Sequence, residues 1–211
     1  REGALSWPEV LRIGVKVCGA LETAHSAGTL HRDIKPANIL VNDYAEPQLT
    51  DFGIAHVEGG YKTATGFFSG TIDYTAPEVM TGNPATIASD IYSLGATLYA
   101  LVAGNAAHER RSGEDLLAQY LRISSTGVPD LRSEGIPEAV CAAIEHAMAL
   151  DPADRPASAA AFGRELQAAQ RRNGLKPDAM AITGAKVDTG RTVTIPRDAT
   201  AGAAIQSPPA T

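Results

Sequence analysis

The stretch His31-Arg32-Asp33-Ile34-Lys35-Pro36-Ala37-Asn38, called the 31–38 loop below, decides how this chain is interpreted. It brings a carboxylate, an ammonium group and an amide into one short segment, and Asp51-Phe52-Gly53 follows at close range. In many proteins Asp and Asn in such a segment only satisfy turn hydrogen bonds, which is the simple structural alternative. The fixed order and spacing of the two motifs instead favour a chemical role.

The residues on either side predict that this loop joins a helix to a β-hairpin. Ser6 followed three residues later by Glu9 is a capping-box pattern, and apolar residues then recur at helical spacing up to about His25. Gly28 is expected to end that helix. Beyond the loop, two apolar runs separated by turn residues predict hairpin strands at 39–41 and 48–50.

The rest of the chain is predicted to be mainly helical and to end in a linker. Glycine, threonine and serine dominate residues 52–77 without a period, which predicts a long irregular segment. After Asn173 the aromatic residues vanish, and the remaining composition buries too little surface to offset chain entropy. We therefore expect a folded domain over residues 1–172 and a disordered linker or tail over 173–211. Helical patterns in the domain lie at 89–103, 113–123, 137–150 and 158–171.

Composition argues against several classes of protein. The chain has 18 Lys and Arg against 24 Asp and Glu, and this net charge of −6 argues against a nucleic-acid interface. Cys18 and Cys141 lie far apart in apolar surroundings, as core residues do and zinc ligands do not. The longest uncharged run, 91–107, is too short and too often interrupted for a membrane span, and the chain has no secretory leader. We expect a cytoplasmic protein.

Three further motifs complete an ordered set. They are Gly70-Thr71-Ile72-Asp73-Tyr74-Thr75-Ala76-Pro77-Glu78, Ser89-Asp90-Ile91-Tyr92-Ser93-Leu94-Gly95 and Asp151-Pro152-Ala153-Asp154-Arg155-Pro156. With them, the chain resembles the bacterial eukaryotic-type (Hanks-type) serine/threonine protein kinases over residues 6–172. This resemblance implies an α+β protein kinase-like fold, present as its mainly helical C-terminal lobe with a short β-hairpin at the catalytic site. Stretches at 48–55, 109–114 and 170–174 resemble family members in which the kinase is fused to a transcriptional regulator, so a downstream regulatory domain is expected in the parent protein.

The resemblance implies transfer of the γ-phosphate of ATP to serine or threonine hydroxyls of protein substrates. Phosphoryl transfer depends mainly on alignment and on neutralising charge at the moving phosphate. Asp33 is expected to orient the hydroxyl and accept its proton, and Lys35 to place a positive charge beside the phosphate. Asn38 and Asp51 carry hard oxygen ligands and are therefore the expected ligands of Mg²⁺ (or Mn²⁺).

Two more residues receive roles by the same resemblance. Leu40 is expected to form part of the floor under the adenine ring, although ordinary strand core is an equal alternative. Thr71 is expected to link the peptide-binding loop to Asp33 and Lys35. Thr71 and Lys35 together favour serine and threonine over tyrosine as acceptors.

Control of the activity is expected at the irregular segment. Arg32 precedes Asp33, and in kinases of this arrangement the arginine binds an activation-loop phosphate through a charge-assisted contact. Thr63 and Thr65 are the candidate phosphorylation sites. The alternative is that these threonines belong to a solvated turn.

Structural support is expected from three charged residues. The resemblance makes Glu78 the partner of Arg155 in a buried ion pair, whereas an exposed pair would contribute little. It also makes Asp90 the residue that holds the backbone of the 31–38 loop. The alternative for Asp90 is a simple acidic residue in the first turn of a helix.

Neither a GxGxxG pattern nor a Val-Ala-x-Lys strand occurs before the 31–38 loop. We therefore expect the N-terminal, nucleotide-gripping lobe to be missing from this chain, and the isolated chain to be catalytically incompetent although its parent is a kinase. The alternative from another functional class is a non-catalytic, kinase-like docking or scaffold module in signalling. Intact Asp33, Lys35, Asn38 and Asp51 favour the first hypothesis.

Overall fold

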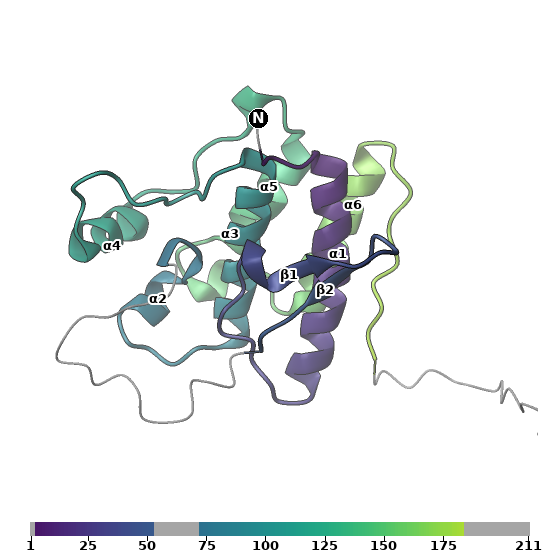
Figure 1. The fold of residues 1–211 in the computed structure, drawn as a ribbon, viewed down its shortest axis with the longest axis horizontal. Helices are drawn as coiled ribbons and strands as arrows, with labels where there is room; N and C mark the ends of the chain where they lie inside the picture. The colour runs from purple at the N-terminus through teal and green to yellow at the C-terminus, as the bar shows by residue number, and fades with distance from the viewer. Residues whose placement is uncertain (1–2, 53–71, 184–211) are drawn as a thin grey trace, which may run out of the picture.

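The computed structural model describes residues 3–52 and 72–183 (Figure 1). The elements follow in the order α1 (Trp7–Ser26), η1 (Pro36–Asn38), β1 (Ile39–Val41), β2 (Pro47–Leu49), η2 (Ile72–Tyr74), α2 (Pro77–Met80), α3 (Ile87–Ala103), α4 (Leu116–Ser125), η3 (Arg132–Glu134), α5 (Glu138–Ala147), η4 (Pro152–Asp154) and α6 (Ala159–Arg172).

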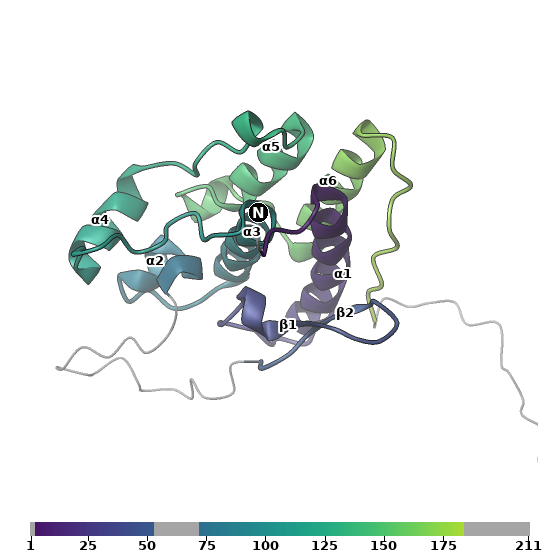
Figure 2. The same ribbon diagram turned by 45° about the horizontal axis from the view of Figure 1, so that its top comes forward.

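Helix α3 is the centre of the helical body. Of its 17 residues 13 are buried, so it has no polar face for solvent. Helices α1 and α5 pack against α3, and α6 packs against both α1 and α5 (Figure 2). Cys18 and Cys141 are buried in this body. No helix of the described part of the chain is long and apolar enough to cross a membrane. The mainly helical architecture predicted from the sequence is confirmed.

The predicted hairpin is also confirmed. Strands β1 and β2 pair antiparallel, with Ile39 opposite Leu49 and Val41 opposite Pro47. The second strand therefore begins one residue earlier than the sequence pattern indicates. Strand β2 packs against α1, which places the hairpin on the surface of the helical body, directly after the 31–38 loop (Figure 1).

The caps of helices α1 and α3 differ from those that the sequence pattern predicts. Ser6 is the N-cap of α1, but its side chain makes no capping hydrogen bond, so the predicted capping box is wrong. The entering chain is instead held by Leu5, whose backbone N–H donates to the Leu101 carbonyl at 2.7 Å. A reciprocal capping box does form between Thr86 and Ser89, and α3 therefore begins two residues earlier than predicted.

Residues 174–183 run back along α6 and α1 after the end of the last helix (Figure 1). The domain boundary expected at residue 172 stays a prediction. Residues 184–211 of the expected linker lie outside the described residues.

Candidate active site

Asp90, buried at the start of α3, holds the backbone of the 31–38 loop. Its Oδ2 accepts hydrogen bonds from the His31 backbone N–H at 2.8 Å and from His25 Nε2 at 2.9 Å, and its Oδ1 accepts one from the Arg32 N–H at 2.9 Å. Arg32 has a φ of 68°, in the left-handed region that residues with a side chain seldom adopt. The bonds to Asp90 therefore stabilise a strained turn immediately before Asp33.

Three predicted site residues converge one turn further on. Lys35 Nζ donates to Asp33 Oδ2 at 2.8 Å. Asn38 Nδ2 donates to the Asp33 carbonyl at 2.7 Å and to Asp33 Oδ2 at 3.1 Å. The Asp33 side chain is 43% exposed, so the carboxylate is oriented by these donors and still open to a substrate. An oriented, accessible carboxylate next to a fixed positive charge suits a proton acceptor in group transfer.

His31 joins this loop to the segment that carries Asp51. The ring is fully buried; Nε2 donates to the Thr50 carbonyl at 2.8 Å, and Nδ1 accepts from the Asp33 N–H at 3.3 Å. These two partners assign the neutral tautomer with its proton on Nε2. The ring also packs on Phe52, with ring centroids 4.6 Å apart. One buried side chain thus sets the distance between the two motifs.

Asn38 is tied to the second motif through the backbone. The Thr50 N–H donates to the Asn38 carbonyl at 2.9 Å, so the residue before Asp51 is bonded directly to Asn38. Asp51 itself has a φ of 57°, a second left-handed residue at the site. Leu40 is 54% exposed on β1, which does not fit ordinary strand core and leaves the adenine-floor role as a prediction.

The chemistry of this donor set fits a magnesium ion. The nitrogen end of the Asn38 amide makes both bonds to Asp33, which turns its oxygen away from that residue. No group of three or more His, Cys, Asp or Glu side chains able to hold a metal occurs among the described residues. Mg²⁺ is commonly held by one or two protein oxygens completed by water and substrate phosphates, so Asn38 and Asp51 would supply enough protein oxygens for such an ion.

Glu78 and Arg155, both predicted support residues, form a bidentate ion pair. Arg155 donates to the two Glu78 carboxylate oxygens at 2.7 and 2.8 Å. The Arg155 side chain has 0% exposure and also donates to the carbonyls of Ala88, Ala149 and Leu150. Its guanidinium lies 4.9 Å from the centre of the Tyr92 ring. This one arginine connects α2, the start of α3 and the segment after α5.

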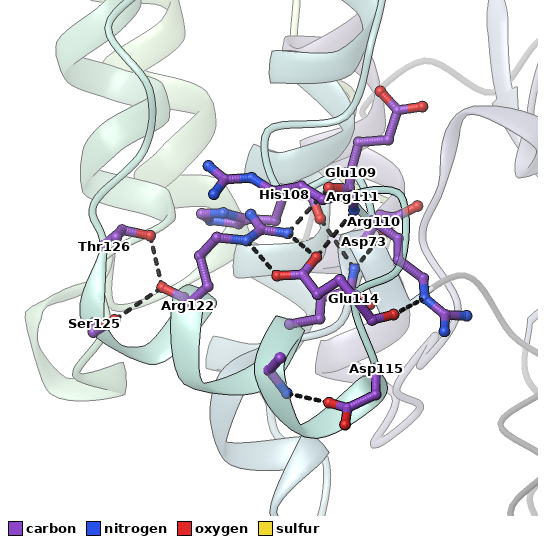
Figure 3. A network of polar contacts seen from close by, with 12 residues as sticks. Asp73, His108, Glu109, Arg110, Arg111, Glu114, Asp115, Arg122, Ser125 and Thr126 are labelled. Carbon is purple, nitrogen blue, oxygen red and sulfur yellow. Dashed lines mark hydrogen bonds and ion pairs between the residues drawn. The ribbon is translucent and has the colours of Figure 1, made fainter.

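A second polar network fixes the chain just beyond residue 71 (Figure 3). Gln119 of α4 is buried, and its Nε2 donates to Asp73 Oδ1 at 2.9 Å and to the His108 carbonyl at 3.0 Å. Glu114 accepts two 2.8 Å bonds from Arg122, and these bonds lower the pKa of Glu114 to about 2. Burial raises the pKa of the Asp73 carboxyl above its ordinary value. The network anchors η2 to α4.

Three predicted residues cannot be placed. Thr63, Thr65 and Thr71 lie outside the described residues. Their expected roles in regulation and substrate contact therefore stay predictions.

Comparison with known proteins agrees with this arrangement of motifs. The family model described as protein kinase domain matches residues 1–166. The chain belongs to the protein kinase family. Among curated kinases, the serine/threonine-protein kinase PknK of Mycobacterium bovis is 60% identical over 182 residues, which is 86% of this chain and 16% of that protein. PknK of Mycobacterium tuberculosis gives the same figures. A probable serine/threonine-protein kinase of Corynebacterium efficiens is 35% identical over 202 residues, 93% of this chain and 30% of that protein.

The resemblance to bacterial serine/threonine kinases stated from the motifs is thereby confirmed. The chain spans 16% of the length of the PknK proteins it matches. The activity and partners of a whole protein that contains it are therefore proposals.

Two histidines that support the candidate site were not predicted from the sequence. His25 bonds to Asp90, and His31 joins the two motifs, yet neither was assigned a role. A signal for His25 was available, because it lies four residues after buried Leu21 and therefore on the same face of α1. His31 stood inside the 31–38 loop, but nothing local to it reveals Thr50 as its partner.

Proposed function

We propose that the protein containing this chain is a serine/threonine kinase that transfers the γ-phosphate of ATP to protein hydroxyls. The observation that carries the proposal is the convergence of Lys35 and Asn38 on the Asp33 carboxylate, within a lobe of the protein kinase family. Asp33 holds the acceptor hydroxyl and takes its proton, and Lys35 sits beside the phosphate. The curated relatives named above carry serine/threonine kinase in their names.

The cofactor part of the proposal is ATP with Mg²⁺, or Mn²⁺ in its place. The oxygen of Asn38 and the carboxylate of Asp51 are the residues that would hold the ion. A bound divalent ion supplies neutralisation of phosphate charge. His31 and Thr50 would position that ion relative to Asp33 indirectly, because their contacts hold the segment before Asp51 against the 31–38 loop.

The test uses the full-length parent protein and a peptide with one serine acceptor. Asp33→Asn keeps the shape of the side chain and removes its basicity, so we expect kcat to fall by about 100- to 10,000-fold. The matched control is Asp43→Asn, an exposed aspartate of the hairpin turn, with unchanged kcat. Equal activity of the two variants would exclude Asp33 as the proton acceptor, whereas no phosphate transfer by the unsubstituted parent would favour the docking-module alternative.

The isolated 211-residue chain is proposed to lack this activity. Its sequence contains no glycine-rich GxGxxG loop, the element that covers the ATP phosphates in protein kinases. Incubation of the purified chain with labelled ATP, Mg²⁺ and peptide should give no transfer above the Asp33→Asn background. Transfer that depends on Asp33 would contradict the proposal.

Regulation by phosphorylation of Thr63 or Thr65, with Arg32 as the phosphate ligand, belongs to the same proposal. Phosphopeptide mapping of the active parent should locate phosphate in this pair. Its complete absence from both residues argues against this form of control. The proposal has three further parts. The parent protein has a downstream regulatory domain, and it is located in the cytoplasm, where ATP is available. This segment makes no direct contact with nucleic acid.

A further inference from the structure

The chain beyond the last helix of the lobe is held in a specific position. Helix α6 ends at Arg172, and Gly174, with a φ of 76°, turns the chain back on the helix. The Leu175 N–H donates to the Gln170 carbonyl at 2.9 Å. Residues 175–183, called the strap below, then run along α6 and α1 (Figures 1 and 2).

A buried amide provides the polar anchor of the strap. The side chain of Gln170, a residue with 1% exposure, accepts from the Asp178 N–H at 2.9 Å and donates to Asp178 Oδ2 at 2.6 Å. Gln167 Nε2 donates to the Asp178 carbonyl at 2.8 Å. Both ends of the Gln170 amide thus have their partners on one strap residue, and a buried amide without partners is costly.

Two glycines on the facing helices make room for the apolar anchor. A Cβ on Gly163 of α6 would lie 2.4 Å from the Met180 sulfur, and a Cβ on Gly19 of α1 would lie 2.3 Å from the Ala181 carbonyl oxygen. Met180 packs against the hydrophobic core at this point. Glycine inside a helix is unfavourable relative to alanine. The space that the strap requires is a physical reason for the two glycines at these positions.

The end of the strap is bonded to the turn of α1 that supports the active site. The Thr183 N–H donates to Thr23 Oγ1 at 3.0 Å, and Thr23 Oγ1 donates to the Gly19 carbonyl at 2.9 Å. Two residues further along α1, His25 bonds to Asp90, which holds the 31–38 loop. A continuous set of contacts therefore connects the strap to the loop.

The similarity to the PknK proteins also reaches beyond the last helix. The family model ends at residue 166, whereas the similarity to PknK covers 182 residues, 86% of this chain. A stretch of that length does not fit within residues 1–172, so the similarity extends into the strap.

From these contacts we infer that the strap is an integral part of the kinase lobe, packed along α6 and α1, and that it is a positioning element for the 31–38 loop. The folded lobe then extends to Thr183 and does not end at Arg172. The docking of the strap is independent of any activity. Its effect on the loop rests on the proposed function.

The first test is a double-mutant cycle on the 211-residue chain, measured by thermal unfolding. Gly163→Ala alone should collide with Met180 and lower Tm by about 5 °C. In a Met180→Ala background the collision with the sulfur is gone and only the 3.0 Å approach to Cys18 Cβ remains, so Gly163→Ala should lower Tm by less than it does in the wild-type chain. Additive effects of the two changes would show that the strap is not docked at Gly163.

The second test addresses the coupling to the active site. Met180→Asp should increase amide exchange of residues 23–26 in the 211-residue chain, and in the full-length kinase it should lower kcat several-fold with KM for ATP unchanged. Met180→Leu, which keeps the apolar anchor, should restore both values. Unchanged exchange and kcat in Met180→Asp would overturn the positioning role. The Asp33→Asn assay separates that failure from a failure of the proposed function, because it does not involve the strap.

Discussion

At the scale of single residues, the site depends on buried charges that are each bonded to several partners. Asp90 accepts from two backbone N–H groups and from His25, and Arg155 donates to Glu78 and to three carbonyls. A buried charge costs a large desolvation free energy, which is offset only when its partners are in place. Removing one partner therefore has a large effect on stability.

Replacing Glu78 by alanine strands the Arg155 guanidinium, whose side chain has 0% exposure. We expect the free energy of unfolding to fall by roughly 3 to 5 kcal/mol, because a buried charge loses its counter-ion. The measurement is urea unfolding of the 211-residue chain. Glu46→Ala is the matched control, since Glu46 pairs with Lys16 at the surface and should cost less than about 1 kcal/mol. Equal costs for the two variants contradict the prediction.

Asp90→Asn is expected to loosen the 31–38 loop. An amide offers one acceptor oxygen where the carboxylate offers two, and it turns an N–H group toward the backbone N–H of His31 or Arg32. We expect a loss of about 1 to 3 kcal/mol in the free energy of unfolding. Amide exchange at residues 31 and 32 checks the location of the change. The control is Asp154→Asn, at an exposed position of η4; if it has the same effect, the role assigned to Asp90 is wrong.

At the scale of elements, local patterns predicted the helices well and their ends less well. The apolar periodicities located α1, α3, α5 and α6, because each buries a stripe of side chains at helical spacing. The predicted capping box of α1 does not form although Ser6 is the N-cap, and the entering chain is held by the bond from Leu5 to Leu101 of α3. Helix α2 was not predicted, because four residues are too few to show a period.

The link between α3 and α4 carries a prediction on pH. Burial, with a smaller effect of Arg122, lowers the pKa of His108 from 6.5 to about 4. The unfolded chain therefore binds a proton to this histidine in the range between those two values, where the folded chain does not. We expect the free energy of unfolding to decrease as pH falls from about 6.5 toward 4.

Urea unfolding at several pH values in this window measures the effect. His108→Gln should flatten part of the dependence, because it removes this titrating group from the folded and the unfolded chain alike. An identical pH dependence in the wild-type chain and His108→Gln would show that this histidine does not titrate differently on folding.

At the scale of the whole molecule, the hairpin presents apolar side chains to solvent. Leu40, Val41 and Tyr44 are 54%, 57% and 88% exposed. Contiguous exposed apolar surface promotes association. We expect the 211-residue chain to self-associate with rising concentration in sedimentation velocity.

The double variant Leu40→Ser and Val41→Thr should shift the chain toward monomer. The matched control changes Leu117 and Leu121 to serine; these residues are 65% and 56% exposed on α4, away from the hairpin (Figure 1). A wild-type chain that stays monomeric at all concentrations contradicts the prediction. If only the α4 variant is monomeric, the chain associates through the surface of α4 and not through the hairpin.

The sequence by itself determined the family and the mainly helical lobe, and it predicted the central site residues. These properties follow from short-range spacing: Asp33, Lys35 and Asn38 stand in one loop and meet each other within it. Helical periodicity is equally local, since it needs only neighbouring turns of one segment.

Only the tertiary structure decided how that site is supported. Asp90 meets the 31–38 loop across 59 residues of sequence, and Arg155 meets Glu78 across 77. Thr183 of the strap bonds to Thr23, which lies 160 residues earlier in the sequence. No local pattern specifies such partners, because burial selects them: a charged or amide group keeps its place in the core only where packing brings a complementary group to it.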